Sequence, residues 1–320
     1  MDYEFGTNPC GEIILRPNGF CNLSEVIVRS GDTIETLCNK VELATILGTF
    51  QSTLTDFRYL RKQWRVNAEE ERLLGVSLTG IMDNPILNGS QQDHPGRLLE
   101  ATLDRMKQHA VETNKVWAGK LGISPSAAIT TVKPSGTVSQ LVDSASGIHP
   151  RHNGFYIRTV RADVKDPLAT FLKDQGVPCE QDVTNASNLV FSFPVRAPDG
   201  CVLRSDRSAI QQLEHYLIFK RHWCEHNPSI TVYVKEHEWM EVGAWVYRNL
   251  DDVGGVSFLP HSEQAYQQAP YQDISEADYQ QLAAAFPKID WNMFDGYEKS
   301  EDTTNGSQEY ACTSGACEWL

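Results

Sequence analysis

The sequence has little positive charge, and this scarcity limits the ligands that its surface can attract. Its 320 residues contain 28 Lys and Arg against 42 Asp and Glu, which gives a formal net charge of −14. A protein that holds duplex nucleic acid or an anionic lipid surface needs a basic field. We therefore expect neither nucleic acid nor a membrane among the partners of this chain.

Long hydrophobic runs, a secretory signal and a dense set of cysteines are also lacking. No apolar run approaches the roughly 20 residues that span a bilayer, and the acidic start leads into no apolar stretch. Eight cysteines are too few for a disulfide scaffold of this length. Hydrophobic residues make up 41% of the chain, which is ordinary for a globular protein. We expect a soluble, cytoplasmic protein with buried, metal-bound or catalytic thiols.

Hydrophobic periodicity predicts alternating helices and strands. Apolar residues recur at three- and four-residue steps over 40–64 and 96–121, which is typical of one buried helix face. Shorter helices are expected over 208–226 and 276–286. Buried strands are expected where β-branched or aromatic residues cluster, at 127–132, 188–195, 230–234 and 255–259. This alternation indicates an α/β fold.

The two ends of the chain differ from its body. Residues 298–311 are nearly all charged, small or amide-bearing, which predicts a flexible linker. Such a linker spans roughly 20 Å on average and about 45 Å when stretched. We therefore expect a body over 1–297 and a mobile tail over 298–320. The dense polar motif at the start has no scaffold before it, which suggests the second part of a larger protein.

The first motif places three reactive side chains at alternate positions. Asn8, Cys10 and Glu12 share one side of an extended backbone, while the Pro and Gly between them favour a tight loop. An amide, a thiol and a carboxylate would then meet in one small volume. A turn with one buried thiol is the simpler alternative, but a second thiol follows at Cys21, and the combination is far less generic than either part.

A second motif follows the predicted strand at 127–132. The residues 133–137 are Lys-Pro-Ser-Gly-Thr, and they open a short predicted helix. Small residues at a helix start leave backbone N–H groups available to phosphate oxygens. An ordinary helix start is the competing interpretation, and the motif alone does not decide between them.

Two residue pairs have a spacing that can bind zinc, but neither predicts a metal site. Cys312 and Cys317 lie beyond the linker among small residues, with no second Cys or His pair nearby. This setting favours thiol exchange, in which a mobile pair reduces an internal disulfide and then meets a soluble reductant. His222 and His226 lie four apart on a predicted helix, where surface or capping histidines are more common.

Three separated blocks carry a family resemblance. They are residues 8–12 with Cys21, residues 131–139 and residues 311–318. Together they resemble the large catalytic chain of ribonucleotide reductases, most closely the adenosylcobalamin-dependent, monomeric ribonucleoside-triphosphate reductases. Iron-dependent members pass a radical through two adjacent tyrosines, and none of the eleven Tyr here adjoins another. This favours adenosylcobalamin as the cofactor, although no residue is assigned to its pocket.

The resemblance implies a role for each residue of the first block. Cys10 matches the thiyl radical that removes the hydrogen atom at C3′, and Glu12 matches the base that accepts the 3′-hydroxyl proton. Asn8 would orient the ribose hydroxyls. Cys21 matches one thiol of the pair that reduces the substrate. Its partner lies upstream in family members, and the four thiols at positions 38, 179, 201 and 224 are interpreted as structural.

The other two blocks match a phosphate site and a redox tail. Family members hold the substrate phosphates at the positions of Ser135, Gly136 and Thr137. The tail residues Cys312 and Cys317 match a pair that thioredoxin reduces. The implied substrate is a ribonucleoside triphosphate, and the product is a deoxyribonucleotide for DNA replication.

The resemblance also implies the architecture. Family members form an α/β barrel of ten strands from two five-stranded parallel halves, with the Cys10 finger loop threaded through the centre. This chain would supply the second half, and a separate N-terminal half would be its obligate partner. Two alternatives remain: a non-catalytic nucleotide-binding or interaction fragment, and a thioredoxin-like oxidoreductase. The latter uses only the tail and leaves the first motif unexplained.

Overall fold

The computed structural model describes residues 4–91, 97–261 and 267–298. The chain divides into two compact units. Unit 1 comprises residues 1–151 and 198–261, and unit 2 comprises residues 152–197 and 262–320. The body predicted over 1–297 thus contains two units. The predicted tail lies outside the described residues, apart from Glu298.

Parallel strands form the centre of unit 1. Strand β3 (Asn22–Ile27) pairs with β4 (Leu74–Thr79), and β8 (Ser229–Val234) pairs with β9 (Gly255–Pro260). The segment 127–132 lies between these pairs, with single parallel bridges on each side. The strands expected at 230–234 and 255–259 are confirmed, whereas 127–132 forms bridges without a continuous strand. The described strands of unit 1 do not close into a barrel.

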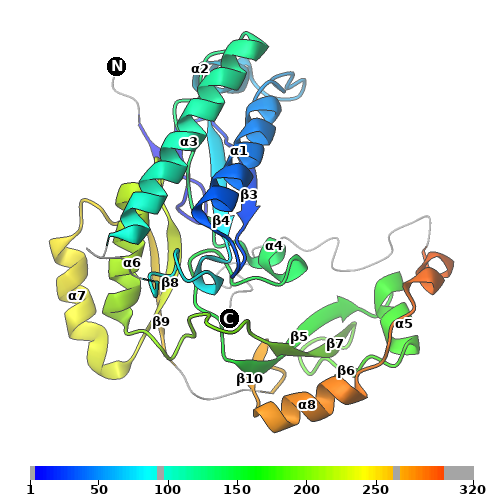
Figure 1. Ribbon diagram of the computed structural model, residues 1–320. Helices are drawn as coiled ribbons and strands as arrows, with labels where there is room; N and C mark the ends of the chain where they lie inside the picture. The colour runs from blue at the N-terminus through cyan, green and yellow to red at the C-terminus, as the bar shows by residue number, and fades with distance from the viewer. Residues whose placement is uncertain (1–3, 92–96, 262–266, 299–320) are drawn as a thin grey trace. The chain divides into compact units, whose positions relative to one another are not determined.

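Helices cover these strands because parallel strands bury both of their faces. All six residues of β4 are buried. Helices α1 (Ile34–Gln51) and α3 (Leu98–Leu121) lie side by side in Figure 1. The other helices against this core are α6 (Ala209–His222) and α7 (Trp239–Arg248). The smaller elements of the unit are β1 (Gly6–Thr7), β2 (Ile14–Leu15), α2 (Lys62–Glu71), η1 (Ile81–Asp83), α4 (Gly136–Leu141) and η2 (Glu236–Glu238).

The long helix predicted over 40–64 is wrong. Thr33 caps α1 and starts it earlier, the helix ends at Gln51, and α2 begins only at Lys62. Leu43 and Leu47, on the predicted buried face, are 68% and 63% exposed. The opposite side of α1 packs inward instead. The apolar spacing therefore identified one face of a helix correctly, but that face is exposed and not buried.

The other helix predictions are confirmed within a few residues. The stretch 96–121 forms α3, and the stretch 208–226 forms α6, with Ser208 as its N-cap. The stretch 276–286 forms α8 (Glu276–Ala285) in unit 2. Across the described residues, no helix combines the length and the apolar character that crossing a membrane requires.

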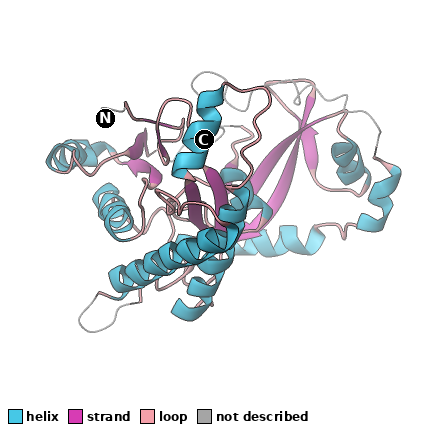
Figure 2. Ribbon diagram, turned by 90° about the horizontal axis from the view of Figure 1, so that it is seen from above, coloured by secondary structure: helices cyan, strands magenta, loops and turns pink. Residues whose placement is uncertain are grey.

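Unit 2 is built on an antiparallel sheet that the predicted α/β alternation does not include. Its strand order is β10 (Tyr271–Asp273), β5 (Phe155–Asp163), β7 (Asn188–Arg196) and β6 (Cys179–Gln181). The long pair β5 and β7 gives the long magenta arrows of Figure 2. Only β7 was expected. Helix α5 (Pro167–Asp174), α8 and η3 (Trp291–Gly296) complete the unit, so the fold is mixed α/β.

Candidate active site

A short hairpin presents the first motif. Strands β1 and β2 pair antiparallel, and the turn between them carries Cys10. Oδ1 of Asn8 accepts the N–H of Ile13 at 3.0 Å, and this bond closes the turn. Cys10 is exposed and Glu12 is fully buried. The turn at 9–11 is the tight loop that the Pro and Gly favour.

The parallel strands hold the hairpin turn through its backbone carbonyls. The Ser229 hydroxyl donates to the Cys10 carbonyl at 2.7 Å. Asn227 donates its side-chain N–H to the carbonyl of residue 11 at 3.0 Å and its main-chain N–H to that of Glu12 at 3.0 Å. The hydroxyl of Thr131 also reaches the Glu12 carbonyl, at 3.2 Å. Residues more than 100 positions away thus fix the motif in space.

Two glycines allow the hairpin to touch the sheet. Gly11 has a φ of 77°, and a Cβ there would lie 3.1 Å from the Cα of Gly255. A Cβ on Gly255 would lie 2.8 Å from the Pro228 carbonyl oxygen. Because the contact is backbone to backbone, no larger residue fits at either position without a shift.

His226 also anchors the hairpin, which explains one of the two histidines considered for zinc. Its Nδ1 accepts the N–H of Ile14 at 3.3 Å, and its Nε2 contacts the Leu74 carbonyl at 2.9 Å. This pattern requires a neutral ring with the proton on Nε2, and burial lowers the His226 pKa accordingly. His222 instead contacts Asp104 at 3.0 Å. Within the described part of the chain, no group of three His, Cys, Asp or Glu is arranged to hold a metal.

A carboxylate, an ammonium and a thiol meet beneath the hairpin turn. Neither carboxylate oxygen of Glu12 has a hydrogen-bond partner among the described residues, and Nζ of Lys133 lies 3.7 Å from Oε1. Burial and the charge of Glu12 raise the pKa of the Cys21 thiol to about 12, while Lys133 opposes this shift. Gly75 makes room for the thiol, because a Cβ there would lie 2.9 Å from Sγ of Cys21.

The second motif forms a strained turn into α4. Ser135 precedes the helix with a φ of 58°, in the left-handed region that non-glycine residues rarely adopt. Its hydroxyl donates to Oε2 of Glu25 at 2.7 Å and does not cap the helix. Gly136 is half-buried and Thr137 is exposed. The backbone N–H groups of this first turn have no partner within the helix.

The remaining thiols divide between the two units. Cys38 and Cys224 are buried, whereas Cys179 and Cys201 are half-buried. Burial raises the pKa of Cys201 to about 11. The tail residues Cys312 and Cys317 lie outside the described residues.

Sequence reasoning did not identify the residues that hold the site. Asn227, Ser229 and Thr131 contact the motif through ordinary amide and hydroxyl groups that carry no spacing signal. Lys133 was considered only for phosphate, but its ammonium faces Glu12. The adjacent glycines at 254 and 255 were the available clue, because glycine at a strand start often marks close backbone approach.

Comparison with known proteins gives similar sequences in one enzyme family. No protein-family model matches the chain. Adenosylcobalamin-dependent ribonucleoside-triphosphate reductases are similar: that of Lactobacillus acidophilus is 26% identical over 98% of this chain and 45% of its own length. That of Lacticaseibacillus paracasei is 27% identical over 88% of this chain and 40% of its own length. That of Lactobacillus leichmannii is 24% identical over 98% of this chain and 45% of its own length. The chain therefore spans less than half the length of these relatives.

A solved structure has a similar fold. A crystal structure of a B12-dependent, class II ribonucleotide reductase aligns with a TM-score of 0.79 and 23% sequence identity. The alignment covers 94% of this chain and 45% of that chain. The likeness establishes that the fold corresponds to part of that larger structure.

Proposed function

We propose that this chain, which is a homologue of the adenosylcobalamin-dependent ribonucleoside-triphosphate reductases, reduces ribonucleotides together with a separate N-terminal half. The observation that carries this proposal is the hairpin site. Its exposed Cys10 lies two residues before the buried Glu12, and burial and the charge of that carboxylate raise the pKa of the Cys21 thiol. These are the groups that thiyl-radical reduction of a ribose requires.

Cys10 starts the proposed reaction. Replacing the ribose 2′-hydroxyl by hydrogen begins with removal of the hydrogen atom at C3′, and a thiyl radical suits this step because its S–H bond has comparable strength. The exposed position of Cys10 in the hairpin turn fits an external radical source. Adenosylcobalamin, when bound, supplies that radical.

Glu12 and Asn8 handle the ribose hydroxyls in this proposal. The Glu12 carboxylate accepts the 3′-hydroxyl proton as a general base. Its two oxygens are buried and are engaged by no hydrogen bond among the described residues, so a substrate that reaches the carboxylate would displace no hydrogen-bond donor. The Asn8 amide oxygen already holds the turn, which leaves the amide NH₂ to donate to a ribose hydroxyl.

Cys21 supplies the proton for the departing 2′-hydroxyl. With a pKa of about 12 the thiol stays protonated at neutral pH, as a proton donor must. The two electrons come from Cys21 and a partner thiol in the N-terminal half, which become a disulfide as the ribonucleotide becomes a deoxyribonucleotide and water. Cys312 and Cys317 then reduce that disulfide by thiol exchange and are themselves reduced by thioredoxin.

The substrate phosphates are assigned to the turn at Ser135, Gly136 and Thr137. The support is the first-turn N–H groups of α4, which have no partner within the helix, together with the left-handed Ser135. The Ser135 hydroxyl is committed to Glu25, so backbone groups make the contact. The substrate is a ribonucleoside triphosphate, and we place the reaction in the cytoplasm.

Two features of unit 1 support a partner half: parallel strands that do not close and an exposed apolar helix face. Five parallel segments of unit 1 line up without closing, as expected for one half of a ten-stranded barrel around the hairpin as its finger loop. Helix α1 also exposes Leu43, Leu47 and Phe50 along one side. Exposed apolar side chains that gather on one face are typical of an interaction surface.

Deoxynucleotide formation from CTP tests the proposal. The assay contains adenosylcobalamin and a dithiol, with this chain alone and then co-expressed with the neighbouring N-terminal half. Activity only in the mixture is expected. Activity of the chain alone would contradict the need for a second half. Inactivity of both preparations without association would favour a non-catalytic nucleotide-binding or interaction fragment.

A further inference from the structure

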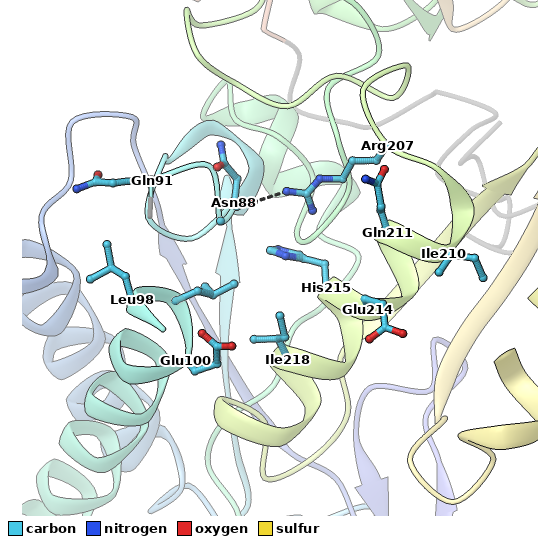
Figure 3. Close-up of a pocket in the computed structure, with 12 residues that line it drawn as sticks. Asn88, Gln91, Leu98, Glu100, Arg207, Ile210, Gln211, Glu214, His215 and Ile218 are labelled. Atoms are coloured by element: carbon cyan, nitrogen blue, oxygen red, sulfur yellow. Dashed lines mark hydrogen bonds between the residues drawn. The ribbon is translucent and has the colours of Figure 1, made fainter. Parts of the chain in front are cut away.

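A cavity in unit 1 lies apart from the hairpin site and shares no residue with it. The cavity is open to solvent and has a volume of about 370 Å³, and it lies between the loop ending at Gln91, the start of α3 and one face of α6 (Figure 3). Leu98, Leu99, Ile210 and Ile218 form its apolar wall. Pockets of a few hundred Å³ with an apolar wall and a few polar groups are typical of small-molecule sites.

His215 projects from α6 into this cavity (Figure 3). The side chain is 5% exposed, and its Nε2 has no hydrogen-bond partner among the described residues. Burial and the nearby charge of Arg207 lower the His215 pKa to about 3, so the ring is neutral at pH 7. A buried polar nitrogen without a partner costs free energy, and such groups are rare in folded proteins. A ligand that accepts a hydrogen bond would remove this cost.

Arg207 places a positive charge at the same end of the cavity. Its guanidinium donates to the Asn88 carbonyl (Figure 3), and it forms no ion pair within the described residues. Burial lowers its pKa, and Asp206 opposes that shift. The remaining N–H donors of a guanidinium suit a carboxylate or a phosphate, which accept them in pairs.

Two carboxylates restrict the charge that the cavity accepts. Glu100 and Glu214 line it, and Oε1 of Glu214 accepts the indole N–H of Trp245 at 2.6 Å. A ligand with several negative charges would meet repulsion from both. The cavity therefore suits a compact ligand with one anionic group and an apolar body.

We propose that this cavity binds a small organic anion, with its carboxylate or phosphate group between Arg207 and His215 and its apolar body against Leu98 and Ile218. Nε2–H of His215 and the free donors of Arg207 hold the anionic group. The proposal uses no residue of the hairpin site and goes beyond the proposed reductase function. A ligand there would join α6 to the start of α3.

Binding of benzoate to the full chain tests the proposal. The imidazole of His215 is observed by ¹⁵N NMR during the titration, and affinity is measured by calorimetry. We expect the His215 signals to move and benzyl alcohol, which has the same ring without the charge, to bind at least about tenfold more weakly. Phenyl phosphate and inorganic phosphate distinguish an organic phosphate from free phosphate as the ligand. Inorganic phosphate is expected to bind at least about tenfold more weakly than phenyl phosphate, because it leaves the apolar wall unused.

Matched variants connect binding to the two cavity residues. Arg207→Gln is expected to weaken benzoate binding at least about tenfold, whereas Arg248→Gln, on the exposed end of α7, is expected to leave it unchanged. His215→Phe keeps a ring and removes Nε2, so it is expected to weaken binding with the fold intact, as far-UV circular dichroism reports. Three results would overturn the proposal: no binding of benzoate or phenyl phosphate, equal binding of benzyl alcohol, or unchanged affinity in both cavity variants. Equal binding of phenyl phosphate and inorganic phosphate would overturn the inference that the ligand has an apolar body.

Discussion

Two buried polar groups of unit 1, the Glu12 carboxylate and Nε2 of His215, have no hydrogen-bond partner in the described part of the chain, but their surroundings differ. The backbone around Glu12 is fixed by bonds from distant segments, and an ammonium lies 3.7 Å away. His215 instead extends from a single helix into an open space of about 370 Å³. Unpartnered buried groups cost stability. The first group is therefore held at a set position, whereas the second faces open space.

Loss of the Cys10 thiol is the largest effect expected on the hairpin side of this comparison. Cys10→Ala should reduce deoxynucleotide formation by the assembled enzyme to background, because no other group at the hairpin tip can carry the radical. Cys10 is exposed, so the fold should be unaffected. Cys179→Ala, in unit 2, is the control and should retain activity. Turnover by the Cys10 variant would contradict the assignment of Cys10 as the thiyl radical. The hairpin would then no longer differ from the cavity in its chemistry.

In the proposed reaction the hairpin site receives electrons from the C-terminal tail, whereas binding in the cavity involves no electron transfer. Replacing Cys312 and Cys317 together by Ser should allow about one turnover per chain and then stop thioredoxin-driven cycling. A small dithiol should restore cycling, because it reaches the internal disulfide directly. Product per chain in a single-turnover assay, with each reductant in turn, measures this effect. Unchanged kinetics with thioredoxin would show that the tail is not the shuttle.

The space around the hairpin site is also smaller than the space on an exposed helix face. A Cβ on Gly75 would lie 2.5 Å from Cδ2 of Leu23 and 2.9 Å from Sγ of Cys21, so Gly75→Ala should lower the free energy of unfolding by about 1–3 kcal/mol. Gly243→Ala, on α7, meets no atom within 4 Å and should raise it by up to about 1 kcal/mol. Urea unfolding of the two variants measures both values. Equal stability of the two would mean that the space around Cys21 is not tightly fixed.

Much of unit 1 was predictable because its elements have strong periodicity. Helices α3 and α6 and strands β8 and β9 appear where the sequence indicates them. Helix α1 shows the limit, because apolar spacing identifies a face but not what covers it. The antiparallel sheet of unit 2 was largely missed. Strand β5 mixes Arg and Thr with apolar residues, and most of its positions are only half-buried.

The candidate site was predictable only where it lies within one stretch of sequence. Cys10, Glu12 and Cys21 are close together in the chain and carry distinctive chemistry. The residues that hold them, such as Asn227 and Ser229, come from a segment more than 200 positions away. Only the fold brings these segments together. His215 gave no signal either, because a histidine on a helix is most often a core or surface residue.

The dependence of stability on pH tests whether the His215 ring is buried without a partner, and it is the smallest effect expected here. The His215 pKa is lowered from 6.5 to about 3, so the folded protein holds the ring neutral while the unfolded chain binds a proton below about pH 6.5. The stabilisation is present at neutral pH and is lost as the pH falls. Between about pH 6 and pH 4, this group should lower the free energy of unfolding by about 1.4 kcal/mol per pH unit.

The His215→Phe variant isolates that slope. His149 and His226 also have pKa values lowered by burial, but they are present in both proteins and cancel in the difference. The charged groups that line the cavity around the ring, which are Arg207, Glu100 and Glu214, are likewise unchanged. Urea unfolding across this pH range should show the wild-type protein losing stability faster than the variant. Parallel curves would mean that His215 takes up its proton in the folded state, and a ring that does so is solvated and is not a buried group without a partner. The two unpartnered groups would then differ in exposure alone, and the contrast between a fixed site and a receptive cavity would fail.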